Sequence, residues 1–273
     1  MMTQNKNGRK WMIVDAHAHI FPKKIAEKAT KSIGSFYDAK MLHTGTPNLL
    51  LESGAKIGTA KYLVSSTATK PEQVEAINTF IAEECGKHPE FFGFGTMHPG
   101  YENIEAEVDR ILALGLHGVK LHPDFQQFYI DDPDVMPMYR IIEQAGLPIL
   151  FHTGDKRMDY SAPKRLHDVA VKLPGLTCIA AHFGGYNNWS EGAMHLLLPN
   201  VYFDTSSSLF ALTRDQALGL LEHFGIDRFM FGTDFPMWDH QQELNRFLAL
   251  GLSDEENEKI FSQNFQRIFH TTL

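Results

Sequence analysis

The sequence predicts a single domain of the α/β class spanning residues 1–273, a (β/α)8 barrel with helices between eight parallel strands. Short apolar runs rich in β-branched and aromatic residues recur eight times, and most are apolar almost throughout, which is typical of strands buried on both faces. Segments with helical spacing lie between them, and this alternation favours parallel strands joined by right-handed crossovers. Eight units in about 250 residues is the size of a closed barrel. A doubly wound open sheet is the competing arrangement, because periodicity does not distinguish the two.

The predicted strands and helices follow in order along the chain. The eight strands are 11–17, 61–67, 91–97, 117–122, 148–153, 177–182, 201–206 and 228–234. Apolar residues at helical spacing predict helices between these strands, in 71–87, in 102–115, before Gly146 and before Pro174. Two capping boxes, Thr213 with Gln216 and Ser253 with Glu256, predict where later helices begin.

The connection between the first two predicted strands, residues 21–60, is longer than the others. It contains a helical stretch, Lys23 to Ile33, followed by residues that favour a loop, Gly34, Gly45 and Pro47. We expect this connection to form an extended first loop that lies over the mouth of the barrel.

Composition excludes several classes of protein. The net charge is −8 and the pI is about 5.9, so the chain lacks the basic surface that a nucleic-acid-binding protein needs. Two cysteines, against 14 histidines, are too few for a disulfide framework or a cysteine-ligated zinc site. No apolar run is long enough for a membrane span, and the N-terminus lacks the apolar part of a signal peptide. We expect a cytoplasmic protein that acts on a small molecule, and the sequence leaves a homo-oligomer open.

Chemically reactive side chains stand at or near the ends of most predicted strands. They are Asp15, His17, His19, His98, Lys120, His122, His152, His182, Asp204 and Asp234. In a barrel the carboxyl ends of all strands open onto one face, where active sites are built. Residues that are far apart in the sequence would therefore meet there.

The spacing of His17 and His19 indicates a metal site. Side chains two apart on a strand lie on the same side, so both imidazoles can bind one cation. A metal such as Zn2+ takes histidine nitrogens and a carboxylate oxygen, and His152 and Asp234 would complete the set. A lone histidine at a strand end is more often a hydrogen-bonded rim residue, but so many polar groups in an apolar mouth would lack partners without a cation. We expect one divalent metal ion, with Zn2+ as the first choice and two ions as the alternative.

Five motifs together resemble a known family. VDAHAHIF, GVKLHP, LFHTG, AHFGG and FGTDFP, in this order and spacing, resemble the amidohydrolase superfamily. The resemblance is greatest to its amidohydrolase-2 branch of TIM-barrel metal-dependent hydrolases, which includes decarboxylases related to the aminocarboxymuconate-semialdehyde enzyme. It covers the chain from Asp15 to about Asp234 and the closing helices.

The resemblance assigns roles to individual residues. It implies that His17 and His19 are metal ligands and that Asp234 is both a ligand and a proton shuttle. It matches His152 and His182 to the histidines of the fifth and sixth strands. In a site with one metal, His182 would hydrogen-bond the water or the developing oxyanion; in a site with two, it would join His152 on the second ion.

Lys120 falls where members of the superfamily with two metals carry a carbamylated lysine that bridges the ions. Many members of the amidohydrolase-2 branch bind a single ion, so the resemblance leaves this position undecided. The alternative is a lysine that reaches the rim and pairs with Asp124 or with an anionic substrate.

Two enzymatic functions fit these residues. The first is hydrolysis of an amide, ester, lactone or cyclic imide by a metal-activated water, with Asp234 as the proton shuttle. The alternative is non-oxidative decarboxylation of a small unsaturated or aromatic acid, because ligands alone do not fix the chemistry. A metal-dependent binding protein is less favoured, because the water-handling aspartate is kept with the ligands. Arg157, His122 and Trp238 are the residues we expect to contact the substrate.

Overall fold

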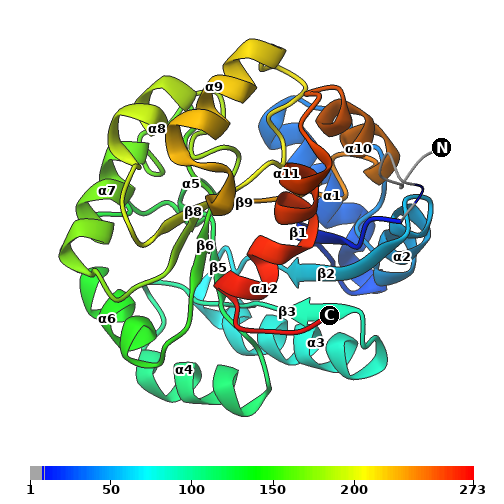
Figure 1. Ribbon diagram of the computed structural model, residues 1–273. Helices are drawn as coiled ribbons and strands as arrows, with labels where there is room; N and C mark the ends of the chain where they lie inside the picture. The colour runs from blue at the N-terminus through cyan, green and yellow to red at the C-terminus, as the bar shows by residue number, and fades with distance from the viewer. Residues whose placement is uncertain (1–7, 9) are drawn as a thin grey trace. The chain divides into compact units, whose positions relative to one another are not determined.

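The computed structural model describes residue 8 and residues 10–273, and the chain folds into two compact units. The terminal unit contains the described residues up to Val64 together with residues 205–273, and the central unit contains residues 65–204. Strands alternate with helices through both units, and the strand pairings given below are parallel, which confirms the predicted α/β class (Figure 1). None of the helices among the described residues is long and apolar enough to cross a membrane.

The central unit contains five parallel strands whose spatial order follows the sequence. They are β4 (Gly95–Thr96), β5 (Val119–Leu121), β6 (Ile149–Phe151), β7 (Cys178–Ala180) and β8 (Val201–Asp204). The register places Leu121, Phe151, Ala180 and Phe203 in one row, and all four side chains are fully buried. The residues that come directly after this row therefore emerge together at the carboxyl ends of the strands.

Helices lie on the outside of these strands, as Figure 1 shows. They are α3 (Val74–Lys87), α4 (Ile104–Ala113), α6 (Met136–Gln144), α7 (Pro163–Lys172) and α8 (Trp189–His195), whereas the single-turn helix α5 (Pro123–Gln126) directly follows β5. The predicted strand 91–97 is split into β3 (Phe91–Gly93) and β4. Glycine is needed at Gly93 because a Cβ atom there would lie 2.7 Å from Cys85 Sγ of α3. This close approach seats α3 against the sheet.

The terminal unit contains β1 (Ile13–His19), β9 (Phe229–Met230) and all but the last residue of β2 (Thr59–Ser65). Its helices are α1 (Lys23–Tyr37), α2 (Pro47–Ala55), α9 (Arg214–Phe224), α10 (His240–Leu248), α11 (Asp254–Glu258) and α12 (Asn264–Ile268), with a π-helical turn, Lys259–Gln263, between the last two. Both predicted capping boxes are confirmed, one opening α9 and the other α11. The segment after β9 runs beside β1, where His19 N donates to Phe235 O at 2.7 Å and Ala18 forms a parallel bridge with Phe235.

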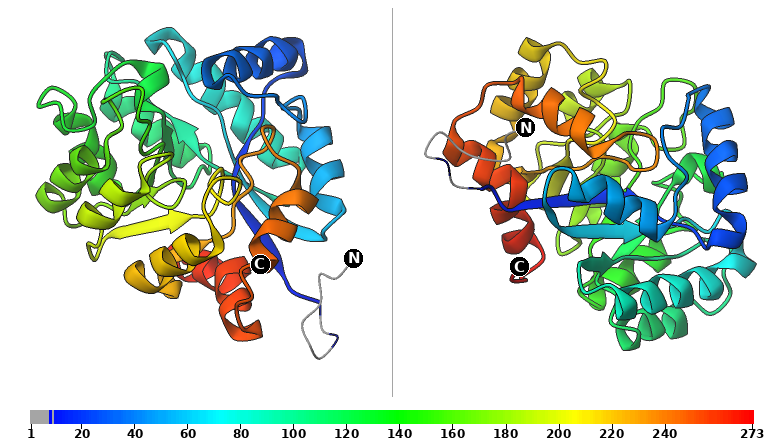
Figure 2. Two further views of the ribbon diagram at one scale, coloured as in Figure 1. Left: turned by 90° about the horizontal axis from the view of Figure 1, so that it is seen from above. Right: turned by 90° about the vertical axis from the view of Figure 1, so that its right-hand side faces the viewer.

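The first long connection differs from the prediction at its centre. The helix expected to end at Ile33 continues to Tyr37, and the expected loop around Pro47 is the start of a second helix, α2. Thr46 caps α2 because its Oγ1 accepts a hydrogen bond from Leu49 N, and proline suits the first helical position. The threonine–proline pair was thus a helix start rather than a loop signal. Figure 2 shows α1 and α2 as two separate helices of this connection.

Candidate functional site

Three predicted metal ligands meet in the terminal unit. His17 Nε2 and His19 Nε2 of β1 lie 3.2 Å apart. Asp234 Oδ1 lies 3.2 Å from His19 Nε2 and 3.8 Å from His17 Nε2. The His17 side chain is fully buried, whereas those of His19 and Asp234 are 17% and 13% exposed. We call these three residues the triad.

The backbone explains why Asp234 reaches β1. Asp234 N donates a hydrogen bond to His17 O at 2.8 Å, so the two ligand-bearing segments are joined directly. Asp234 has φ +58°, a left-handed conformation that aspartate and asparagine tolerate better than most residues. The turn after β9 therefore aims the carboxylate back toward the two imidazoles.

The triad fits a divalent cation. Tetrahedral coordination at about 2.0–2.1 Å places neighbouring ligand atoms about 3.3–3.4 Å apart. The three distances in the triad, 3.2, 3.2 and 3.8 Å, bracket that spacing. Two imidazole nitrogens at 3.2 Å must share either a proton or a cation, because their lone pairs repel. Two nitrogens with one carboxylate oxygen form a donor set that suits zinc and other transition metals.

Two serine hydroxyls hold the outer atoms of the triad. Ser206 Oγ lies 3.1 Å from His17 Nδ1, and Ser207 Oγ donates a hydrogen bond to Asp234 Oδ2. A hydrogen bond at Nδ1 fixes the ring orientation of a histidine, and a proton on Nδ1 leaves Nε2 able to bind a metal. The sequence interpretation missed this role, because a run of hydroxyl residues after a strand is more typical of a helix cap. Here Thr213 caps α9 instead.

Asp15 connects the two backbone segments that carry the triad. Its Oδ1 accepts hydrogen bonds from His17 N at 3.1 Å and Thr233 N at 2.9 Å, and its Oδ2 accepts one from the Thr233 hydroxyl. Asp15 is fully buried. A buried carboxylate requires several donors, and these three come from the segments on which His17 and Asp234 stand.

Trp238, a predicted substrate contact, is engaged within the terminal unit. Its indole Nε1, the only hydrogen-bond donor of the side chain, donates to Ser207 Oγ at 2.9 Å. The same hydroxyl donates to Asp234. The Trp238 ring stacks on Phe210, with centroids 5.0 Å apart, and the Arg246 guanidinium lies 4.6 Å from the ring centroid. The remaining ring surface is what Trp238 can offer to a ligand.

A second cluster of titratable groups lies in the central unit, at the ends of its strands. His152 Nδ1 lies 3.0 Å from His182 Nε2, and His152 Nε2 lies 3.5 Å from Asp124 Oδ2. All three residues are buried. The three groups form a row in which His152 is hydrogen-bonded to His182 and lies within ion-pair distance of Asp124. We call it the histidine chain.

Asp124 is the most perturbed member of the histidine chain. Burial raises the pKa of its carboxyl to about 6, although Ser161 Oγ donates a hydrogen bond to Oδ2 at 2.6 Å. Asp124 Oδ1 is buried and has no hydrogen-bond partner among the described residues. A carboxyl with this pKa gains and loses its proton about one pH unit below neutrality. The sequence interpretation named Asp124 only as a partner for Lys120.

His182 owes its position to an unusual backbone turn. It has φ +62°, its N–H donates to Asp204 Oδ1 at 3.1 Å, and its carbonyl accepts from Trp189 Nε1 at 3.0 Å. Asp204, which ends β8, thus anchors the neighbouring strand end. The sequence interpretation had left Asp204 without a role.

His122 and Lys120 flank the histidine chain. The His122 ring stacks on Phe125 and on His152, with centroids 3.7 and 4.0 Å apart and nearly parallel planes. Parallel stacked imidazoles cannot both direct a lone pair at one ion, which argues against a metal between His122 and His152. Lys120 lies on β5 with its side chain fully buried, and its carbamylation stays a prediction.

Arg157 is the predicted substrate contact with the greatest freedom. Its guanidinium forms a bidentate pair with Asp155, with Nη2 2.6 Å from Oδ2 and Nε 3.0 Å from Oδ1, and its side chain is 46% exposed. To bind a substrate carboxylate it would have to share or exchange this partner.

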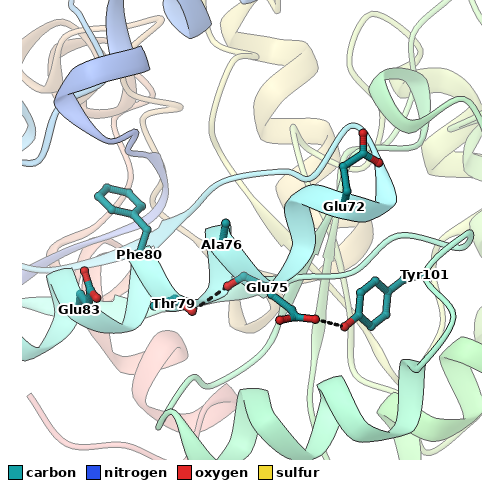
Figure 3. A pocket seen from close by; sticks show the side chains of 7 residues that line it. All are labelled: Glu72, Glu75, Ala76, Thr79, Phe80, Glu83 and Tyr101. Atoms are coloured by element: carbon teal, nitrogen blue, oxygen red, sulfur yellow. Dashed lines mark hydrogen bonds between the residues drawn. The ribbon is translucent and has the colours of Figure 1, made fainter.

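A surface pocket on α3 is separate from these residues (Figure 3). It is lined by Glu72, Glu75, Ala76, Thr79, Phe80, Glu83 and Tyr101. The Tyr101 hydroxyl donates to Glu75 at 2.6 Å, which raises the pKa of the tyrosine to about 12. The pocket contains none of the predicted site residues.

Comparisons with known proteins bear on the family and the fold. The family model described as amidohydrolase matches residues 14–271. The structure is similar to a TIM-barrel protein from Bordetella bronchiseptica, with a TM-score of 0.75, 19% identity and coverage of 95% of this chain and 98% of that one. At this identity the likeness shows the fold alone.

Two further similar structures belong to enzymes. One is 5-carboxyvanillate decarboxylase from Novosphingobium aromaticivorans, complexed with manganese and 4-hydroxy-3-methoxy-5-nitrobenzoic acid; its TM-score is 0.76 at 17% identity, with 99% of this chain and 100% of that one covered. The other is described as a 2-pyrone-4,6-dicarboxylic acid hydrolase from Pseudomonas putida, with a TM-score of 0.69, 17% identity and coverage of 96% of this chain and 99% of that one. Other similar structures are decarboxylases as well.

Proposed function

The chain belongs to the amidohydrolase family, and from this premise we propose that it is a metal-dependent carboxy-lyase that removes carbon dioxide from a small aromatic or unsaturated acid. The sequence favoured hydrolysis and held decarboxylation as the alternative. The order changes because decarboxylases prevail among the similar structures described above, including one with manganese bound. The triad is the observation that carries the metal dependence, since its three ligand atoms converge as a divalent cation requires. The choice of decarboxylation is supported by the similar structures, because ligands alone do not fix the chemistry.

We assign the cation to His17, His19 and Asp234. When bound there, a divalent ion would offset negative charge on the substrate oxygens. The donor set accepts both Zn2+ and Mn2+, and Zn2+ stays a prediction from the sequence. The assignment of His152 as a further ligand, and that of Lys120 and His182 to a second ion, also stay predictions.

Decarboxylation requires a proton donor. The bond between the carboxylate carbon and its neighbour breaks, the electron pair stays on the neighbouring carbon, and that carbon then takes a proton while carbon dioxide leaves. We assign this proton to the His182 ring. It would pass from Asp124 to His152 Nε2, from His152 Nδ1 to His182 Nε2, and leave from His182 Nδ1 to the carbon. The pKa of about 6 at Asp124 supports the role, because such a carboxyl exchanges its proton within about one unit of neutral pH.

Asp234 is then mainly a ligand and a positioning group. Its Oδ1 faces both imidazoles of the triad, while its Oδ2 accepts the Ser207 hydroxyl. In the hydrolytic alternative the same carboxylate would take the proton of a water molecule. The P. putida hydrolase among the similar structures supports that alternative, and a lactone is the substrate it suggests.

A parallel screen for the two products distinguishes the reactions. The Mn2+-loaded protein is incubated with hydroxybenzoic and enoic acids labelled with 13C at the carboxyl carbon, and separately with lactones and amides. We expect labelled carbon dioxide from at least one acid and no hydrolysis of the other panel. Hydrolysis of a lactone or amide without carbon dioxide release from any acid would contradict the proposal and favour the alternative.

A further inference from the structure

His240 is a fully buried histidine that the proposed reaction does not use. It is the first residue of α10, directly after the Asp239 cap. Its Nε2 lies 3.0 Å from Asp15 Oδ2, and its Nδ1 lies 2.9 Å from Ser53 Oγ of α2. The Nδ1 contact is a hydrogen bond, whereas the Nε2 contact is an ion-pair contact, because Nε2 has no hydrogen-bond partner among the described residues.

Through Asp15, His240 is connected to the triad. Asp15 accepts the backbone N–H groups of His17 and Thr233, the latter adjacent to Asp234. His240 is the only ionisable side chain, among the described residues, within ion-pair distance of Asp15. A shift of the Asp15 carboxylate would move both backbone segments that carry the triad.

Through Ser53 of α2, His240 is connected to the long first connection. Ser53 is 1% exposed, and the next residue, Gly54, is so close to Tyr62 that a Cβ atom on it would lie 2.0 Å from the tyrosine hydroxyl. The Tyr62 ring in turn meets the His240 ring edge to face, with centroids 5.8 Å apart. Helix α2 is thus seated tightly beside α10, as Figures 1 and 2 show.

A second contact fixes α2 to the start of α10. Asp239 Oδ2 accepts from Lys56 Nζ at 2.9 Å and lies 3.1 Å from His43 Nε2, while Asp239 Oδ1 caps the helix. Lys56 and His43 both belong to the long first connection. Residues 43–56 therefore contact both Asp239 and His240, the residue that contacts Asp15.

We propose that His240 and Ser53 are positioning residues for the triad: together they fix the Asp15 carboxylate, and through it the backbone of His17 and Asp234. The inference rests on the proposed metal role of the triad. It gives the first long connection a function inside the terminal unit, namely to hold the metal ligands at their mutual distances. Groups that orient metal ligands are worth about 10- to 100-fold in metal affinity.

Titration with Mn2+, followed by the EPR signal of the free ion, tests the proposal. His240→Phe keeps an aromatic ring at this position but removes both nitrogen contacts. We expect it to weaken Mn2+ binding about 10-fold and to leave the circular dichroism spectrum unchanged. Ser53→Ala should weaken binding by a smaller but measurable factor. Ser262→Ala is the matched control, because it removes a buried hydroxyl of the same unit that donates only to the Glu258 carbonyl, and it should leave Mn2+ affinity unchanged.

The double variant Asp15→Asn/His240→Phe tests the route. If His240 acts through Asp15, the double variant binds Mn2+ no more weakly than Asp15→Asn alone. Fully additive losses would overturn the proposal, as would wild-type affinity in both His240→Phe and Ser53→Ala. Should His240→Phe fail to fold, Ser53→Ala alone decides. Failure of the unaltered protein to bind Mn2+ would instead overturn the triad assignment, and this inference with it.

Discussion

Replacing Asp234 with asparagine is expected to reduce turnover by about 1,000-fold or more and to weaken Mn2+ binding by more than about 100-fold. The amide is nearly the same shape as the carboxylate and tolerates the φ of +58° at this position, so the turn after β9 should keep its conformation. What it loses is the negative charge beside His17 and His19. The loss in affinity should exceed that from removing an outer support, because Asp234 is assigned as a direct ligand.

The measurement pairs steady-state turnover with Mn2+ titration and thermal unfolding. Ser208→Ala is a suitable control, because Ser208 Oγ donates to the Ser206 carbonyl rather than to a triad atom, and it should retain activity and affinity. Normal Mn2+ affinity in a folded Asp234→Asn protein would remove this residue from the site.

Replacing His182 with asparagine should reduce turnover by about 100- to 10,000-fold while leaving Mn2+ affinity unchanged. Asparagine tolerates the φ of +62°, and the backbone N–H can still donate to Asp204. The side chain, however, cannot carry a proton from His152 to the substrate. Loss of turnover without loss of metal is the signature that separates a proton donor from a ligand.

The two measurements are made on the same protein preparation, with His223→Asn, an exposed position on α9, as the control. A fall in bound metal from two ions to one in His182→Asn would contradict the proton-donor role. It would support instead the arrangement with two ions, in which His182 is a ligand of the second.

Much of the fold follows from local sequence patterns. Buried parallel strands are apolar almost throughout, and the row of Leu121, Phe151, Ala180 and Phe203 shows why such residues were recognisable. The capping boxes at Thr213 and Ser253 depend on residues three apart and were equally readable. Helix α2 was missed because Pro47 was weighed as a loop residue, although proline after a capping threonine commonly opens a helix.

The triad was recognisable for the same reason, because His17 and His19 lie two apart on one strand and their spacing fixes their common side. The side chains that position the triad could not be recognised from the sequence. Ser206, Ser207 and His240 act through contacts with segments far away in the sequence, and nothing in their local spacing indicates a partner. Asp124 likewise gains its raised pKa from burial, which depends on tertiary packing.

The central claim, that His17 and His19 bind one divalent ion together, is tested most directly by pulsed EPR of Mn2+ bound to protein labelled with 15N at histidine. The spectrum reports the imidazole nitrogens that are bound to the ion. We predict at least two in the unaltered protein and one fewer in His19→Gln. Tightly bound Mn2+ without coupling to any histidine nitrogen, or the same number of nitrogens in both proteins, would contradict the account.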